Sequence, residues 1–101
     1  MKAYLAMPAG YPKAGIVVIQ EILGVNKDIR AMTDAWAANG YAAIAADLFW
    51  RLKSGVELDA DIPEEFQEGL DRLPKFNADK SVEDLAASIA ALRSRGCAVY
   101  F

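Results

Sequence analysis

The chain has 101 residues, a net charge of −3 at pH 7 and a pI near 4.8, with 54% hydrophobic and 25% charged residues. This balance predicts one ordinary globular domain, not a disordered chain. No stripe of Lys and Arg is present to neutralise phosphates, which argues against a nucleic-acid partner. The apolar run 16–19 is too short to span a bilayer, and Met1-Lys2 opens no convincing signal peptide. The single cysteine, Cys97, fits a reducing compartment, so we expect a cytoplasmic protein without a membrane partner.

The first half of the chain has the pattern of a β-α-β unit. Residues 3–7 are β-compatible, and residues 16–20 begin with a continuous apolar run that is typical of a central strand buried on both faces. A helix is predicted over about 27–39, where Asn and Gly end it, and 41–46 reads as the next buried strand. Such a unit joins parallel strands by a right-handed crossover.

The second half begins with an acidic window. Residues 57–71 hold seven of the fourteen acids and no Lys or Arg, which indicates a solvated surface. Pro63 and the acids after it predict a helix start. Ser81 with Asp84 three residues later predicts a capping box for the last helix, and 97–101 reads as the opening of another strand.

Two predicted helices carry apolar stripes that we expect to face the sheet. In each helix the apolar residues of the stripe recur every three or four positions, as expected of a helix that packs on a sheet. The stripe of the earlier helix is Ile29, Met32, Ala35 and Trp36, and that of the last helix is Val82, Leu85, Ile89 and Leu92.

The segment 16–26 is the most informative part of the chain. Its buried strand delivers a carboxylate, Glu21, directly before a Gly-containing turn. An unpaired buried charge costs several kcal/mol, roughly, so Glu21 needs a partner or a chemical role. It has three possible surroundings: an ion pair with Arg30 or Arg51, solvent, or an active site.

Three stretches in the right order resemble the N-terminal portion of the dienelactone hydrolase (carboxymethylenebutenolidase) family. Residues 17–26, Val-Val-Ile-Gln-Glu-Ile-Leu-Gly-Val-Asn, resemble the family's strand and loop. Residues 39–49 are similar to its next strand, which ends in Asp-Leu and an aromatic residue, and Asp84-Leu85 resembles the helix before its nucleophile strand. The resemblance implies an α/β-hydrolase fold that hydrolyses lactones and carboxylic esters without a cofactor or metal.

The family roles carry over to two positions. By resemblance, Glu21 corresponds to the acid that modulates the nucleophile, and the backbone N–H of Ile22 corresponds to one oxyanion-hole donor. The rest of the machinery has no match, because the chain has no histidine and no Gly-x-Ser-x-Gly or Gly-x-Cys-x-Gly elbow. Cys97 stands too early in its strand to be the nucleophile and is expected to fill apolar space. The family's substrate-binding arginine aligns with nothing here unless the register shifts to Arg72, so that role is not transferred.

These observations predict a single partial α/β-hydrolase domain over 1–101, with a mainly parallel sheet and flanking helices, lacking the C-terminal half of the fold. The leading hypothesis is a lactone or ester hydrolase whose N-terminal fragment is inactive alone, through truncation or a frameshift. The alternatives are one part of a split hydrolase, or a non-catalytic α/β module. Both alternatives predict self-association or a complementing chain at an exposed sheet edge.

Overall fold

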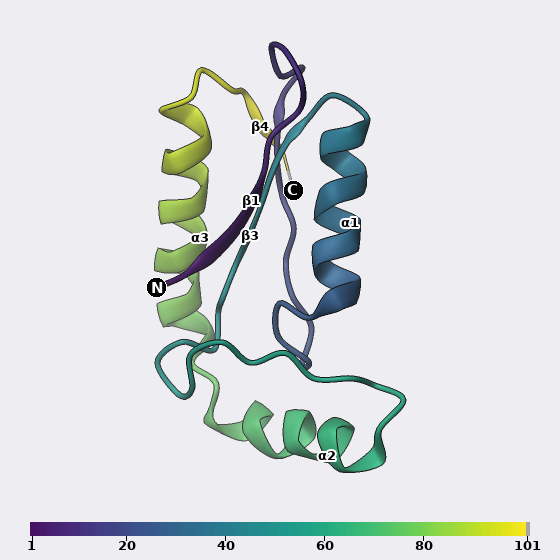
Figure 1. Cartoon of the computed structure of the whole chain (residues 1–101). Helices are drawn as coiled ribbons and strands as arrows, with labels where there is room; N and C mark the ends of the chain where they lie inside the picture. The colour runs from purple at the N-terminus through teal and green to yellow at the C-terminus, as the bar shows by residue number, and fades with distance from the viewer. Residues whose placement is uncertain (101) are drawn as a thin grey trace.

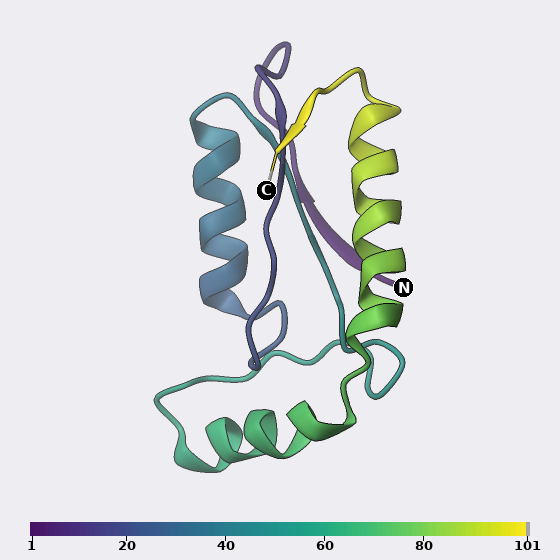
Figure 2. The ribbon, with the colours of Figure 1, turned by 180° about the vertical axis from the view of Figure 1, so that it is seen from behind.

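A mixed four-stranded sheet forms the centre of the molecule, in the order β1-β3-β2-β4. In the computed structural model, which describes residues 1–100, α1 covers one face of this sheet and α3 the other, while α2 lies across one end (Figures 1 and 2). The elements are β1 (Ala3–Ala6), β2 (Gly15–Val17), α1 (Lys27–Ala38), β3 (Ala42–Ala46), α2 (Pro63–Arg72), the 3-10 turn η1 (Leu73–Lys75), α3 (Ala78–Arg93) and β4 (Val99–Tyr100). The predicted partial α/β-hydrolase architecture is confirmed.

The parallel core consists of β2 between β3 and β4. Gly15 pairs with Ala42 on one side and with Val99 on the other, and β1 adds to β3 in the antiparallel direction. β2 is shorter than the predicted strand 16–20, because the last bond to its neighbour runs from the Val18 N–H to the Ile44 carbonyl, 2.8 Å. Beyond this bond the chain leaves the sheet and enters the turn that carries Glu21.

The five residues of β3 are all buried, which explains why four of them are alanine. Small side chains let both covering helices approach the middle of the sheet. On the α1 side, Ala43 packs with Ile16 and Ile29; on the α3 side, Ala42 packs with Leu92. β3 is therefore a central strand with one apolar core on each face.

The structure corrects the predicted sheet-facing stripe of α1. Ile29 is buried, but the other buried residue of the helix is Thr33, whereas Met32, Ala35 and Trp36 are exposed. The Thr33 hydroxyl donates a 2.7 Å hydrogen bond to the Ile29 carbonyl, so its polar group is satisfied inside the helix and can be buried at little cost.

The start of α3 also differs from the prediction. Its N-cap is Asn77, whose Oδ1 accepts a 3.0 Å hydrogen bond from the Lys80 N–H, so Ser81 and Asp84 are not a capping box. Both lie buried within the helix. Of the predicted stripe of α3, only Leu92 is fully buried; Leu85 and Ile89 are half-buried, and Val82 is exposed.

β4 follows α3 and extends the sheet by two residues. Cys97, just before it, is buried against Val17 and Leu92, as expected of an apolar filler. The last residue of the predicted strand 97–101, Phe101, lies outside the described residues.

Candidate functional site

A cavity of about 190 Å³ opens where the parallel strands β2 and β3 end. Ligands of α/β folds bind at this edge, beyond the carboxyl ends of the strands. Three segments distant in sequence form the walls: the loop after β2, the loop after β3, and the stretch around η1. The lining residues are Ile19, Gln20, Glu21, Ile22, Leu48, Phe49, Leu73 and Phe76. The cavity therefore brings both predicted site residues to its wall.

The loop after β2 is a tight turn. The Gly24 N–H donates to the Glu21 carbonyl, 3.3 Å, so that Ile22 and Leu23 are its two central residues. Gly24 has φ +76° and lies directly against the Val56 carbonyl, where any side chain would collide. The Leu23 carbonyl accepts a 2.9 Å hydrogen bond from the Leu58 N–H, which fixes the turn to the segment before α2.

Gln20 ties this turn to the neighbouring strand. Its side-chain Oε1 accepts a 2.8 Å hydrogen bond from the Leu48 N–H just beyond β3, and its Nε2 donates to the Glu21 carbonyl, 3.2 Å. One amide side chain thus links two of the three cavity walls.

The Ile22 N–H is free within the part of the chain that the structure describes. No carbonyl or side-chain oxygen of residues 1–100 accepts a hydrogen bond from it, and the same holds for the N–H groups of Glu21 and Leu23 on either side of it. A half-buried residue with a free N–H at a cavity wall has the form of an anion-binding donor.

The structure corrects the expected burial of Glu21. Its side chain is exposed, because it follows the end of β2 by four residues and stands at the first position of the turn. Neither proposed ionic partner is bound to it: Arg30 pairs with Glu57, and Arg51 pairs with Asp84. The Glu21 side chain is therefore exposed to solvent at the wall of the cavity, without an ionic partner in residues 1–100.

The loop after β3 is closed by Asp47, a buried residue. One carboxylate oxygen accepts from the Phe49 N–H at 3.2 Å and the other from the Gly55 N–H at 2.8 Å. This carboxylate holds Phe49 at the cavity wall. In the Asp-Leu-Phe sequence at 47–49, Asp47 is thus structural, while Leu48 and Phe49 line the site.

A second buried acid fixes the same loop from α3. Asp84 accepts two hydrogen bonds from the Arg51 guanidinium, at 2.7 and 3.0 Å, and one from Trp50 Nε1 at 3.2 Å. The guanidinium also lies 4.7 Å over the Trp50 ring. The bidentate ion pair and the indole bond together satisfy the buried carboxylate.

Sequence reasoning left Arg72 without a role, and the structure places it beside the cavity. Its side chain is 11% exposed, and its guanidinium lies 5.6 Å over the Phe49 ring. Nη2 donates to Glu68 at 2.9 Å, and this hydrogen bond lowers the pKa of Glu68. Nη1 is buried without a partner in residues 1–100, which makes Arg72 a candidate to meet an anionic group. The one feature of the sequence that could have pointed to Arg72 is its place as a basic residue at the end of an acidic helix.

A larger hollow of about 780 Å³ is lined by α2 together with residues 52–53 and Lys75. Its charged residues carry both signs: Lys53, Arg72 and Lys75 face Glu64, Glu68 and Asp71. No residue of the loop that follows β2 takes part in its lining. The smaller cavity is therefore the candidate active site.

Two further findings concern what residues 1–100 can hold. They contain no group of three or more His, Cys, Asp or Glu side chains placed to bind a metal. None of the helices described over this range is long and apolar enough to cross a bilayer. Cys97 does not line the cavity.

The parallel β2–β3 pair, with a helix on each face of the sheet, places the chain in the α/β class. The sequence model of the Dienelactone hydrolase family matches residues 1–99, and the chain belongs to this family.

Curated relatives agree with this assignment. The chain is similar to a putative carboxymethylenebutenolidase of Azospirillum brasilense (44% identical over 79 residues, covering 77% of this chain and 34% of the relative). It is 32% identical over 92 residues to carboxymethylenebutenolidase 1 of Cupriavidus pinatubonensis, a match that covers 91% of this chain and 39% of the relative. It is 33% identical over 91 residues to a carboxymethylenebutenolidase of Pseudomonas putida, a match that covers 90% of this chain and 39% of the relative. The chain thus spans rather more than a third of the length of these relatives.

Proposed function

We propose that this chain supplies the oxyanion-side portion of a hydrolase that opens lactones or cleaves carboxylic esters, and that it is inactive alone. The observation that carries the proposal is the free Ile22 N–H at a cavity beyond the ends of β2 and β3. The names of the relatives, carboxymethylenebutenolidases, support a small lactone as the substrate.

The chemistry assigns the Ile22 N–H a specific step. A nucleophile attacks the carbonyl carbon of the lactone or ester, the C=O electrons move onto oxygen, and an oxyanion forms. The Ile22 N–H donates a hydrogen bond to that oxygen. The C–O bond then breaks, which leaves an acyl-enzyme and an alcohol or enol oxygen, and water hydrolyses the acyl-enzyme. An oxyanion donor of this kind is worth roughly 10²–10³ in rate.

The nucleophile and its base must come from another segment of polypeptide. The sequence has no histidine, no elbow motif, and a cysteine that packs in the core away from the cavity. The cavity supports this division, because about 190 Å³ is less than the roughly 300–1,000 Å³ of a complete small-molecule site.

Glu21 has the position that a nucleophile-modulating acid needs. Its carboxylate is exposed at the cavity wall and makes no ion pair within residues 1–100, so it is free to meet a nucleophile placed over the cavity. A carboxylate next to a thiol or hydroxyl changes its pKa by charge and hydrogen bonding, which is the role that we propose for Glu21. No cofactor is required, and the reducing compartment that suits a single free cysteine is the cytoplasm.

A chimeric enzyme tests this function. Residues 1–99 replace the matching segment of the Cupriavidus pinatubonensis relative, and hydrolysis of p-nitrophenyl acetate and of dienelactone is measured. The chimera, shown to be folded by circular dichroism and a cooperative melt, is expected to turn over both substrates, while the 101-residue chain shows only background. A folded but inactive chimera would contradict the proposal.

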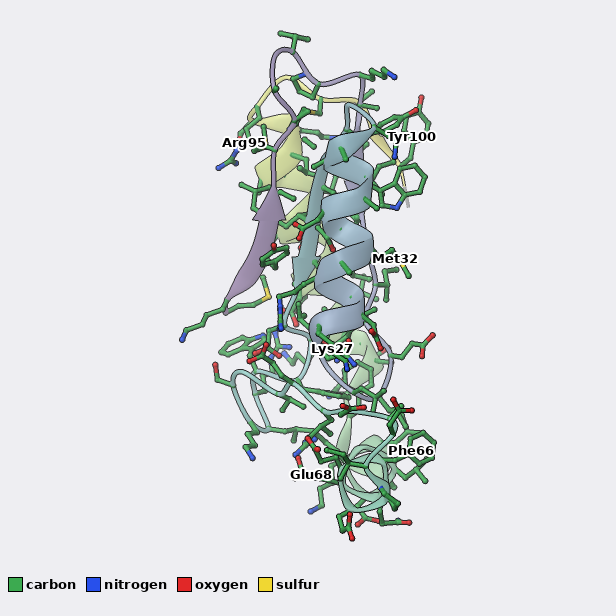
Figure 3. The ribbon with its side chains drawn as sticks, turned by 45° about the vertical axis from the view of Figure 1, so that its right-hand side comes forward. Lys27, Met32, Phe66, Glu68, Arg95 and Tyr100 are labelled. Carbon is green, nitrogen blue, oxygen red and sulfur yellow. The ribbon has the colours of Figure 1, made fainter. Side chains whose placement is uncertain are left out.

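One observation favours a second candidate, a chain that pairs through its sheet edge. β4 is an edge strand whose Tyr100 is 61% exposed, and α1 exposes two further large apolar residues, with Met32 52% and Trp36 39% exposed. Figure 3 shows Tyr100 and Met32 on the same side of the molecule. A split hydrolase or a non-catalytic module would bury this edge against a second chain. Light scattering coupled to size-exclusion chromatography tests it: a monomer that melts cooperatively would argue against both forms of this candidate.

A further inference from the structure

Gly69 is the only buried residue of α2. Most of its other residues are exposed, including a large apolar one at Phe66, and the helix lies across the end of the sheet (Figures 1 and 3). A glycine inside a helix is unfavourable relative to alanine, because it loses more backbone freedom on folding. A reason other than helix formation is needed for it.

The reason is a close backbone approach to the candidate site. A Cβ added at Gly69 would lie 2.8 Å from the carbonyl oxygen of Ile22 and 3.4 Å from its carbonyl carbon. Real Cβ atoms essentially never come within 3.0 Å of another heavy atom, and here the obstacle is backbone that cannot rotate away. Any side chain at position 69 therefore has to displace either α2 or the Ile22 peptide.

The turn has little freedom to move elsewhere. Gly24 is in contact with the Val56 carbonyl, the Leu58 N–H is bonded to the Leu23 carbonyl, and Gln20 is bonded to both Glu21 and Leu48. Gly69 completes this set of contacts on the α2 side. Pressure at the Ile22 carbonyl acts on the Ile22–Leu23 peptide, and because the turn is held on its other sides, we expect the φ and ψ of Ile22, and with them the direction of its free N–H, to change.

We propose that Gly69 is a positioning residue for the oxyanion donor. By allowing α2 to touch the Ile22 carbonyl, it fixes the direction of the Ile22 N–H before substrate binds. This inference rests on the proposed function of that N–H, and it adds a residue of α2 that contacts neither substrate nor nucleophile.

The first test uses the 101-residue chain and two variants of α2, Gly69→Ala and the exposed control Gln67→Ala. In ¹H–¹⁵N spectra, Gly69→Ala is expected to move the Ile22 and Leu23 amide resonances and to lower Tm, whereas the control leaves both resonances in place. Helix propensity alone would raise Tm in the Gly69→Ala variant. An unmoved Ile22 amide with a raised Tm would overturn the proposal.

A variant without added bulk covers the case in which Gly69→Ala does not fold. Gln67→Gly loosens α2 without creating a clash. If α2 restrains the turn through Gly69, the Gly24 and Leu58 amides exchange hydrogen faster in step with those of α2. Faster exchange in α2 with no change at Gly24 and Leu58 would overturn the contact as a restraint.

The catalytic consequence is measured in the chimera described above. There Gly69→Ala is expected to lower kcat about 10²-fold with KM nearly unchanged, because a donor displaced by about 1 Å stabilises the oxyanion poorly. A merely structural role would lower the amount of folded enzyme and leave kcat per folded molecule intact, which would contradict the proposal. The two proposals can fail separately. If the chimera that keeps Gly69 is inactive while Gly69→Ala still shifts the Ile22 amide resonance of the 101-residue chain, the proposed function is rejected and the contact is confirmed.

Discussion

At the residue scale, the cavity walls depend on a few buried acids that perform no chemistry. Asp84 shows this most clearly, since one carboxylate accepts three hydrogen bonds from Arg51 and Trp50. These bonds connect α3 to the loop that places Leu48 and Phe49 in the cavity wall.

Asp84→Ala is therefore expected to lower the free energy of unfolding by about 2 kcal/mol, because it removes hydrogen bonds to a charged group and leaves the Arg51 guanidinium without its acceptor. Urea unfolding measures the loss. Glu83→Ala is the matched control, because Glu83 is exposed and only 3.9 Å from the same arginine, and it should change stability by less than about 0.5 kcal/mol. Equal effects of the two substitutions would contradict this assignment.

The ion pair of Arg72 and Glu68 makes a pH-dependent prediction. The hydrogen bond from Arg72 is the main reason that the pKa of Glu68 is lowered from its ordinary value of 4.5. A lowered pKa in the folded state means that the pair stabilises the fold above pH 4.5 and that this contribution is lost as pH falls through the folded-state pKa.

Arg72→Ala is expected to raise the pKa of Glu68 toward 4.5, as followed by ¹³C NMR of its carboxyl carbon. Lys80→Ala, on the exposed start of α3, should leave this titration unchanged. A Glu68 titration that is the same with and without Arg72 would reject the hydrogen bond as its cause.

Individual residues also show which features of the candidate site could be predicted from the sequence. Glu21 and Ile22 were identified by resemblance, and both line the cavity. The exposure of Glu21 was not predictable, since it depends on the strand ending at Val17. Arg72 was missed because a buried guanidinium over Phe49 is a contact between segments distant in sequence.

At the scale of the elements, helix and strand existence followed from local pattern, while helix orientation did not. The cap of α3 illustrates this, because Asn77 performs the role that the Ser81–Asp84 spacing suggested for Ser81. Asp84 is instead recruited by Arg51, a tertiary contact that no local pattern encodes.

Asn77→Ala should cost about 1 kcal/mol, because it removes the side-chain acceptor of the first turn. Ser81→Ala should cost less than about half as much, since the Ser81 N–H still donates to the Asn77 carbonyl after the hydroxyl is lost. Thermal unfolding of the two variants compares them. A larger loss for Ser81→Ala would restore the original prediction.

The orientation of α1 also depends on tertiary contacts that the local pattern does not encode. Met32 and Trp36 fit an apolar stripe in sequence, yet Thr33 is buried and the two larger residues are exposed. Apolar residues three and four positions apart can place either of two neighbouring helix faces against the sheet. The face that carries Ile29 packs over the alanines of β3, and this tertiary packing is not encoded in the local pattern.

At the scale of the whole molecule, the predicted fold class is confirmed, and the predicted site remains a candidate. β2 and β3 are parallel, helices cover both faces, and the candidate site lies at the carboxyl ends of the strands. Residues 1–100 line the cavity from the β2, β3 and η1 sides. The chain spans 34% to 39% of the length of the relatives named above.

The oxyanion role that we propose for the Ile22 N–H is tested by Ile22→Pro in the chimera. Proline removes that N–H, which bonds to nothing in residues 1–100, and it suits the second position of a turn closed from Gly24 to Glu21. The variant should fold like the parent, keep its KM, and lose roughly 10²–10³ in kcat, while Ile22→Val keeps full activity. A folded Ile22→Pro chimera with unchanged kcat would contradict the account.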